Sequence, residues 1–577
     1  MHVATTSRHY TTKDGEARRY ETHLLRRAYR EGGKVKNQTL ANLSHLPAET
    51  ISAIKRSLAG EALVGADEAV EVVRSRPHGH VAAVATMARQ LGFPRLLGPA
   101  GRERDICYAL ILARVCEPGS KLATTRWWAD TTLWPDLQLE GVGTDEVYAA
   151  LDWLVEQQPA IERRLAGRHL EPGGLVLYDL SSTWLEGATC PLAARGYSRD
   201  GKKNKPQITY GLLTDRQGRP VAVNTFPGNT ADPTAFAETV ETVTQRFELD
   251  RVVMVGDRGM ITTARIDALR CRDENIEWIT ALRAPQIKQL AHTGALQLSL
   301  FDETNLAEIA DPDYPGERLI ACRNPLMADE RARKRAALLA ATEAELDKVA
   351  RQVQRGRLKD PGKIGVRAGK AVDRYKMAKH YQLHIDHGAF TYTRDETSIT
   401  AEAALDGIYV IRTSVDADRL DAAGVVEAYK DLANVEADMR SIKTVDLDLR
   451  PVYHRLEERV AAHVLLCMLA RYLTWHLRQA WAPLCFTDQA PPERADPVAP
   501  AKRSPQAQRK ASRQTTDDGQ PTHSFQSLLA HLATLSRQQV RFPGTDIAID
   551  KLTQPTHVQQ RAFELLDAAV PRTIPGA

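Results

Sequence analysis

The stretch that decides the fold runs from residue 173 to residue 283, and its first apolar run is LVLYDL at 175–180. Such a short run between turn signals is typical of a buried strand. Four similar runs follow: QITYGLLTD (207–215), PVAVNTFPG (220–228), RVVMVGD (251–257) and WITALR (278–283). Helices are expected at about 232–248 and 261–275. The order β-β-β-α-β-α-β predicts a mixed sheet with helical cover.

Outside this stretch the texture of the sequence changes several times, which predicts several domains in a chain of 577 residues. Residues 1–60 are strand-rich and basic, with turns expected at Asp14–Gly15 and Gly32–Gly33, and residues 61–170 have helical periodicity. GIYVIRTS (407–414) resumes the core. We therefore divide the central part into a core of 173–283 with 405–480 and an insertion of 284–404.

The C-terminal part has a different composition. Residues 487–523 are rich in Pro, Ala, Ser and Gln without periodicity, which predicts a disordered linker that contains the basic string Lys502 to Arg513. Residues 524–577 are expected to be a small helical segment.

The overall composition is that of an ordinary globular protein, with 43% hydrophobic and 26% charged residues and a net charge of +4. A nucleic-acid surface would have to come from local clusters of Lys and Arg. Seven scattered cysteines without a Cys-x-x-Cys pair argue against a disulfide framework and a structural zinc site. The apolar residues 460–475 include His463 and Arg471, so we expect a buried helix and no membrane span. These features predict a soluble, cytoplasmic protein.

Two carboxylates follow two of the expected strands. Asp179 ends the apolar part of LVLYDL, and Asp257 comes directly after RVVMVG. The ends of neighbouring strands in an α/β sheet are where functional sites gather. Each aspartate alone could equally be a turn former or a helix cap. Two of them in one sheet favour a site.

A helix expected at 421–442 supplies a third carboxylate. Its apolar seam has alternating steps of four and three residues, through Val425, Tyr429, Leu432, Glu436, Met439 and Lys443. Tyr429, Glu436 and Lys443 recur every seven residues and would lie along one face. A carboxylate in a packing seam is costly unless it is paired or metal-bound. The alternative to a site is an ion pair between Glu436 and Arg440.

Two Asp and one Glu that converge repel one another and raise one another's pKa, and divalent cations would neutralise them. Oxygen ligands without His or Cys favour Mg²⁺ or Mn²⁺ over zinc. Two such ions would activate the attacking oxygen and stabilise the leaving oxygen of a phosphodiester.

The residues also resemble a known family. YDLSSTW around Asp179, GYSRDGKKNKPQITYGLL (196–213) and VVMVGDRGM around Asp257 are similar to the DDE transposases of bacterial insertion sequences. The helix with Tyr429, Glu436 and Lys443 resembles the signature helix of one subgroup. That signature has an Arg three places after the Tyr, where this chain has Leu432. Lys430 or Arg440 would have to make the missing phosphate contact.

The resemblance implies an α/β, ribonuclease-H-like catalytic core with an insertion before the Glu-bearing helix. It implies that Asp179, Asp257 and Glu436 are the catalytic residues and hold two Mg²⁺ ions, or Mn²⁺. Tyr429 and Lys443 would contact the DNA phosphates beside the cut, although Tyr429 would equally suit simple core packing.

Further DNA contacts are open. Arg258 would contact DNA or form a surface ion pair. Lys202, Lys203 and Lys205 lie in a hairpin that would follow the DNA backbone or remain a solvated turn. Trp184 would stack on a displaced base or be buried.

The expected function is that of a cut-and-paste transposase. The N-terminal part, with 61–170 as the expected end-binding region, would bind the terminal inverted repeats of double-stranded DNA. A homodimer would assemble on this DNA, at the nucleoid. The alternatives are a nuclease of the same fold that does not join DNA, and an inactive DNA-binding descendant, which Leu432 keeps open.

Overall fold

The computed structural model describes residues 1–12, 16–61, 70–187, 189–249, 251–272, 275–494, 496–542 and 547–576. The chain forms two compact units. Unit 1 comprises Met1–Arg76 with Arg537–Thr553, and unit 2 comprises Pro77–Ser536 with Gln554–Ala577.

Unit 1 contains two small sheets. The first is an antiparallel sheet of β1 (His2–Thr11), β2 (Ala17–Glu31) and β3 (Lys34–Asn42), followed by α1 (Ala48–Leu58). Gly32 and Gly33 connect β2 to β3 with φ of 58° and 75°, a left-handed conformation that glycine adopts without strain. The turn expected there is confirmed. The turn expected at Asp14–Gly15 lies outside the described residues.

The second sheet corrects the expectation for the C-terminal segment. Its strands are β4 (Glu71–Pro77), β15 (Ser536–Arg541) and β16 (Ala548–Leu552), in the order β16-β15-β4. The segment 524–577 is therefore not only helical. The strands were missed because their partner β4 lies more than 450 positions earlier in the chain, where no local pattern reveals it.

Unit 2 has a helical part built around one long helix, α16 (Glu457–Ala480). The helices that accompany it are α2 (Gly79–Gln90), α3 (Phe93–Leu97), α4 (Arg102–Cys116), α5 (Lys121–Asp130), α6 (Leu133–Asp136), α7 (Thr144–His169), α18 (Phe525–Ala533) and α19 (His557–Glu564). By length and composition α16 would suffice to cross a membrane, but 83% of its apolar window is buried inside the fold. The predicted buried helix is confirmed.

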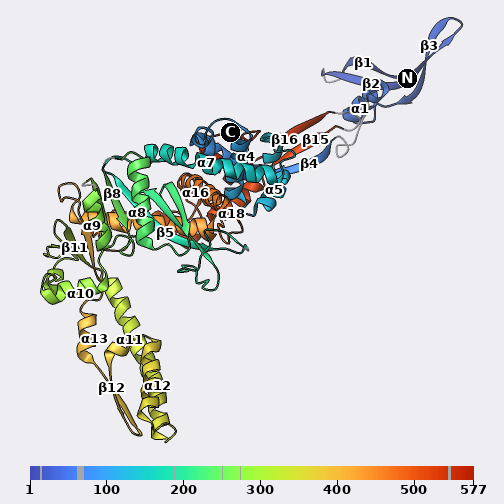
Figure 1. Cartoon of the computed structure of the whole chain (residues 1–577). Coiled ribbons are helices and arrows are strands. Elements are labelled where there is room, and N and C mark those ends of the chain that lie inside the picture. The colour runs from blue at the N-terminus through green and yellow to red at the C-terminus, as the bar shows by residue number, and fades with distance from the viewer. Residues whose placement is uncertain are drawn as a thin grey trace. The chain divides into compact units, whose positions relative to one another are not determined.

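Beside these helices lies an eight-stranded mixed sheet in the order β10-β11-β14-β9-β8-β5-β6-β7 (Figure 1). Its strands are β5 (Leu175–Trp184), β6 (Gln207–Asp215), β7 (Pro220–Pro227), β8 (Val252–Gly256), β9 (Ile276–Ala281), β10 (Leu306–Ile309), β11 (Arg318–Arg323) and β14 (Ile408–Thr413). β5, β8 and β9 are parallel, and the other neighbours are antiparallel. The five strands expected between 173 and 283 and the return at 407–414 are confirmed.

The crossovers of this sheet are helical. They comprise α8 (Asp232–Glu241), which continues as a π-helical turn (Thr242–Arg246), α9 (Thr263–Arg272), α10 (Ala284–Thr293) and a 3₁₀ turn (Leu298–Phe301). Strands β10 and β11 lie inside the range 284–404, which was expected to be an insertion. They belong to the sheet instead, because β11 pairs with β14 along its whole length.

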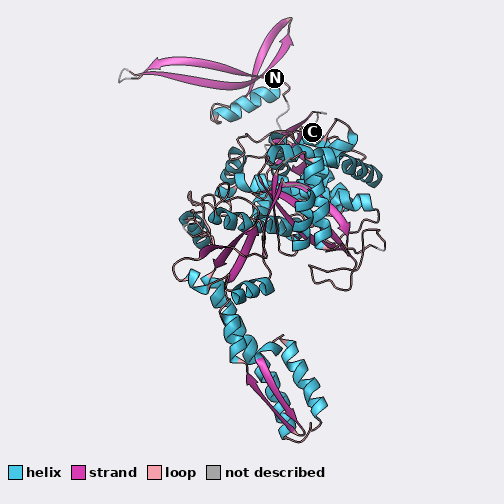
Figure 2. Ribbon diagram, turned by 60° about the vertical axis from the view of Figure 1, so that its left-hand side comes forward, coloured by secondary structure: helices cyan, strands magenta, loops and turns pink. Residues whose placement is uncertain are grey.

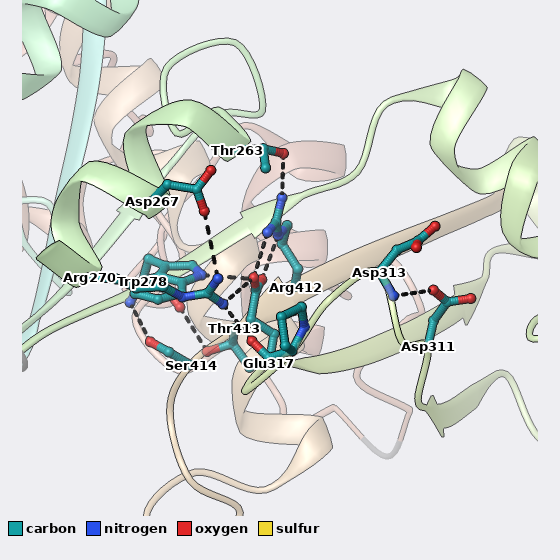
Figure 3. A network of polar contacts seen from close by, with 11 residues as sticks. Thr263, Asp267, Arg270, Trp278, Asp311, Asp313, Glu317, Arg412, Thr413 and Ser414 are labelled. Atoms are coloured by element: carbon teal, nitrogen blue, oxygen red, sulfur yellow. Dashed lines mark hydrogen bonds and ion pairs between the residues drawn. The ribbon is translucent and has the colours of Figure 1, made fainter.

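A buried polar network ties this edge of the sheet to α9 (Figure 3). The carboxylate of Glu317 is fully buried and accepts hydrogen bonds from Arg412 at 2.5 and 2.6 Å and from Arg270 at 2.7 Å. Trp278 donates to the same carboxylate at 3.4 Å, and Arg412 also donates to Thr263 at 3.0 Å. One carboxylate therefore connects α9, β9, β14 and the start of β11.

The true interruption of the sheet is a small lobe between β11 and β14. It consists of α11 (Pro325–Gln354), α12 (Pro361–Arg374), a 3₁₀ turn (Ala378–His380), the hairpin β12 (Tyr381–Asp386) and β13 (Ala389–Arg394), and α13 (Glu396–Ala403). Figure 2 shows the two long helices beside the hairpin. They enclose an apolar core of their own, which includes Leu346, Ile364 and Phe390.

The helix expected at 421–442 is present but interrupted. It forms α14 (Ala422–Lys430), α15 (Leu432–Arg440) and a π-helical turn (Ser441–Val445). At Asp431 the backbone tightens, because Asn434 N–H donates to the Asp431 carbonyl at 2.8 Å, and the Asp431 carboxylate accepts from Arg216 at 2.8 Å. Val425, Val426 and Val435 pack on the sheet strands β5, β8 and β9.

Residues 487–523, for which the sequence predicted disorder, contain the helix α17 (Pro505–Arg513). It follows the turn Ala482–Leu484. The ammonium of Lys510 is buried and donates to the carbonyls of Ala482, Cys485 and Thr487 at 2.8, 2.8 and 2.9 Å. The prediction was wrong because these three bonds order a segment that has little apolar surface.

Candidate active site

Asp179 and Asp257 lie side by side on neighbouring parallel strands. The register of β5 and β8 pairs Tyr178 with Gly256, so the next residue of each strand is one of the two aspartates. Asp179 does not end its strand as expected, because residues 181–184 continue to pair with β6. It lies instead at the level where the neighbour β8 ends.

Glu436 is on α15, whose buried residue Val435 packs on the sheet. Glu436 itself is exposed, so the prediction that the packing seam buries this carboxylate was wrong: the buried face of α15 runs through Val435, Asp438 and Met439. The charge of Glu436 acts on Asp179. Burial raises the pKa of Asp179 to about 6, and the charges of Glu436 and Asp257 act in the same direction. The N–H of Leu180, at 2.8 Å, and Arg199 act against them. The three carboxylates are therefore close enough to sense one another.

The charge of Arg199 acts on this cluster, but Arg199 forms its ion pair with Asp232. Within the described ranges none of the three carboxylates forms an ion pair, and the pair between Glu436 and Arg440 that the sequence allowed is not formed. The side-chain bonds of the two aspartates are to backbone N–H groups, from Leu180 and from Arg258 at 2.7 Å.

An all-oxygen donor set with uncompensated charge fits a hard divalent cation. Across the part of the chain that the structure describes, no group of three or more His, Cys, Asp or Glu side chains is already arranged to hold a metal ion. The fit therefore rests on the chemistry and the proximity of the donors. Asp179, Asp257 and Glu436 are the residues that would hold the metal.

Tyr429 borders the cluster. It is half-buried, and burial raises the pKa of its hydroxyl to about 12, with the charges of Asp257 and Glu436 in the same direction and Arg258 in the opposite one. Its phenol therefore stays protonated at neutral pH and can donate a hydrogen bond. It also packs against the apolar cluster under α14, so both alternatives stated for it agree with its surroundings.

Lys443 is engaged by a residue that the sequence analysis did not single out. Its ammonium pairs with Asp200 at 3.0 Å, and Arg450 pairs with the same oxygen at 2.6 Å. Burial lowers the pKa of Lys443, while Asp200 opposes the shift. The second carboxylate oxygen of Asp200 is buried and has no hydrogen-bond partner among the described atoms. In the sequence, Asp200 was visible only as an acidic residue inside the basic run GYSRDGKKNK, with nothing to mark it as the partner of Lys443.

The position of the missing signature Arg is apolar in the structure as well. Leu432 packs against the cluster under the helix. Of its two suggested substitutes, Lys430 is used internally, because it donates to the carbonyls of Pro497 and Ala499. Arg440 is exposed and forms no ion pair with any described residue. Only Arg440 remains available for a phosphate.

The remaining predicted DNA contacts lie at the surface. Arg258 is exposed and lines a cavity of about 980 Å³ together with α10 and the lobe. Lys202, Lys203 and Lys205 are all exposed. Lys205 pairs with Glu186 at 2.7 Å, and Lys202 lies over the ring of Trp184, 5.4 Å from its centre.

Comparisons with known proteins decide the family. A model of the "Transposase DDE domain" matches residues 186–473, and a model of the "IS1634 family transposase, N-terminal domain" matches residues 8–69. The chain belongs to the DDE transposases of insertion sequences. The transposase is thus an enzyme that cleaves and joins phosphodiester bonds of DNA, in a family that typically uses divalent metal ions. Asp179 lies just outside the matched DDE segment.

The other comparisons add less. No curated protein matches the transposase. One similar solved structure is the cryo-EM structure of a piggyBac transposase synaptic complex with hairpin DNA, at 10% identity over 78% of this chain and 76% of that chain. Its TM-score of 0.33 is too low to support an argument about the fold.

Proposed function

We propose that Asp179, Asp257 and Glu436 are the catalytic triad of this transposase, that they bind two Mg²⁺ or Mn²⁺ ions, and that the element moves by a cut-and-paste route. The observation that supports this most is the placement of Asp179 and Asp257 side by side on β5 and β8, with no ion-pair partner for either aspartate or for Glu436 among the described side chains. Asp179 is half-buried, whereas Asp257 and Glu436 are exposed, so the three carboxylates are accessible to a bound counter-charge.

When bound, the ions supply charge stabilisation to the attacking and leaving oxygens of the phosphodiester. The carboxylates of the chain hold them, and the protonated phenol of Tyr429 is placed to donate to a phosphate beside them. Lys443, fixed by Asp200, orients the adjacent backbone. Attack by water gives the nick, and attack by the freed 3′-hydroxyl gives strand joining.

Two structural features support the finer assignments. The order β7-β6-β5-β8-β9, an antiparallel meander followed by two parallel strands, supports a ribonuclease-H-like core. Exposed Arg258, Lys202, Lys203 and Lys205 around it would contact the DNA backbone.

We further propose that the N-terminal part and the helical region 61–170 bind the terminal inverted repeats. The catalytic core and the lobe between β11 and β14 come after these regions in the chain. Both ends must be cut together, so the transposase would act as a homodimer on DNA at the nucleoid.

The test replaces two carboxylates by amides of the same shape. Asp257→Asn and Glu436→Gln should reduce Mg²⁺-dependent cleavage of element ends at least about 1,000-fold, because each removes several kcal/mol of transition-state stabilisation. Binding of the same DNA in EDTA, measured by fluorescence anisotropy, should be unchanged. Glu427→Gln on the neighbouring helix α14 is the matched control and should cleave normally.

Metal binding gives an independent measurement. Mn²⁺ should raise the melting temperature of the wild-type protein but not of Asp257→Asn or Glu436→Gln. Full cleavage by either amide variant would remove that residue from the triad. A joining assay with pre-cut ends separates the transposase route from simple hydrolysis, since a pure nuclease would leave pre-cut ends unjoined.

A further inference from the structure

A second cavity in unit 2, of about 580 Å³, lies apart from the carboxylate cluster. The start of α5, the helix α7, the loop 448–456 and the start of α16 surround it. The residues that matter for its chemistry are Arg114, Lys121, Tyr148, Arg455, Arg459 and His463. Most of these side chains are cationic or able to donate a hydrogen bond.

Lys121 forms the inner wall of this cavity. Its side chain is only 6% exposed, and its ammonium lies 3.2 Å from Nδ1 of His463. No described carboxylate lies within ion-pair distance of it. A buried cation without a counter-charge is costly, and proteins retain it where a ligand supplies the missing charge.

The residues around Lys121 do not supply an anion either. Arg114 is buried and donates to the carbonyls of Leu447 and Gly119 at 3.3 and 2.7 Å. His463 contacts the carbonyl of Leu449 through its other nitrogen at 3.4 Å. Lys121 and Arg114 are thus two neighbouring cations whose hydrogen-bond acceptors are neutral. The inside of the cavity therefore favours an anion.

The first turn of α5 contributes donors to the same wall. Ser120 is its N-cap, and the Ser120 hydroxyl accepts from the N–H of Ala123 at 3.1 Å. The N–H groups of Lys121 and Leu122 have no acceptor within the helix. Free N–H groups at a helix start, together with a buried ammonium, are the donors that bind phosphate in proteins.

The rim of the cavity is also basic. Arg455 is exposed and pairs with no described carboxylate, and Arg459 lies over the ring of Tyr148 while it pairs with Asp152 at 2.9 Å. Asp448 is the one carboxylate among the residues that line the cavity. The cations outnumber it.

We propose that this cavity is a phosphate site separate from the active site, and that it holds a backbone phosphodiester of the transposon-end DNA. This inference rests on the proposed function. Arg450 links the two places, because it lines the cavity and also pairs with Asp200, the partner of Lys443. A basic path therefore leads from the signature helix to the cavity.

The register gives the distance from the carboxylate cluster to the cavity along β5. Leu185 pairs with Val452 of the cavity loop, and Leu185 directly follows β5, six positions after Asp179. At about 3.3 Å per residue this is roughly 20 Å. A duplex rises about 3.4 Å per base pair, so on a duplex that runs along β5 the phosphate would lie roughly six base pairs from the cut.

The test measures DNA binding in EDTA, so that it is independent of cleavage. The variants are Lys121→Met, which keeps the volume of the side chain, and Arg455→Gln, an exposed change that does not endanger folding. Arg126→Gln is the matched control, since Arg126 is exposed on the same helix and does not line the cavity. The probe is a duplex that ends in the inverted repeat flanking the reading frame.

Each cavity variant should bind about fivefold more weakly at 0.15 M salt, and the slope of log K against log salt should fall by about 0.9. A methylphosphonate that replaces the single phosphate six base pairs from the cut should weaken the wild type and leave Lys121→Met unaffected. Arg126→Gln should behave as the wild type.

Unchanged affinity and slope in both variants, with normal binding by the wild type, would overturn the assignment of the cavity alone. A wild type that binds no duplex would contradict the proposed function as well. Inorganic phosphate is the second probe: if it stabilises the wild type but not Lys121→Met while DNA binding is equal in both, the cavity holds free phosphate and the DNA assignment is wrong.

Discussion

The carboxylates of unit 2 differ in what neutralises them. Asp438 is buried and pairs with Arg471 at 2.6 Å, and Asp200 is buried between Lys443 and Arg450. Burial raises the pKa of both Asp438 and Asp179 to about 6, but Asp179 lacks an ion-pair partner among the described residues. A satisfied pair stabilises the fold, whereas an unsatisfied cluster is available to a ligand. The presence or absence of an ion-pair partner therefore distinguishes the structural carboxylates from the candidate functional ones.

Lys121 gives a test of buried charge by pH. Burial lowers the pKa of its ammonium to about 7, with Arg114 in the same direction. Between pH 7 and 10.5 the unfolded chain therefore holds the proton that the folded chain has lost. The stability of the wild type should rise with pH through this window relative to Lys121→Met, by at most about 1.4 kcal/mol per pH unit.

Thermal melts of the two proteins between pH 7 and 9.5 measure this difference. The neighbouring groups His454, His463, Cys107 and Cys467 are present in both proteins, so their contributions cancel to first order. Parallel curves across the window would show that folding does not lower the pKa of Lys121 and that the folded protein keeps this proton.

The sequence predicts the candidate triad because each member leaves a local trace. Asp179 and Asp257 follow recognisable apolar runs, and Glu436 has a helical period around it. The role of Asp200 leaves no such trace, since its partner Arg450 lies 250 positions later. The same is true of Lys121 and His463, which meet across 342 positions.

At the scale of elements, the edge of the large sheet depends on one acid. Glu317→Gln would leave Arg412 and Arg270 without their shared carboxylate in a buried network. Removal of one partner of a buried pair typically costs about 3–5 kcal/mol. The free energy of unfolding, from urea titration of unit 2 signals, should fall by about this amount.

Glu308→Gln is the control for that experiment. Its side chain is 43% exposed and pairs with Arg318 on the same sheet. Such a surface pair contributes at most about 1 kcal/mol. Equal losses in the two variants would mean that the network of Figure 3 does not stabilise the edge more than a surface ion pair does.

The strands at this edge of the sheet could not be predicted from the sequence. The five strands from β5 to β9 could be predicted because each is a clear apolar run. β10 has only four residues and pairs with β11, and β11 joins the sheet through β14, which follows the lobe. The break at Asp431 was hidden because its backbone stays close to helical, at φ −62° and ψ −16°.

At the scale of the whole molecule, the lobe between β11 and β14 is a self-contained insertion. The N–H of Asn324 donates to the carbonyl of Gly407 at 2.9 Å, directly beside the pair Arg323 and Ile408. The chain therefore leaves and re-enters the sheet at one point. Because the lobe also has its own apolar core, the fold of the sheet does not require it.

This arrangement predicts that the sheet without the lobe and the isolated lobe each fold. A chain in which residues 325–406 are replaced by a short Gly-rich turn should keep the mixed sheet, since two neighbouring antiparallel strands can be joined by a tight turn. Its circular dichroism should retain the strand signal, and Mn²⁺ should still raise its melting temperature, because no triad member lies in the lobe. The isolated segment 325–406 should melt cooperatively. Loss of the Mn²⁺ response in the shortened chain would instead make the lobe part of the metal site, through the cavity wall that it shares with Arg258.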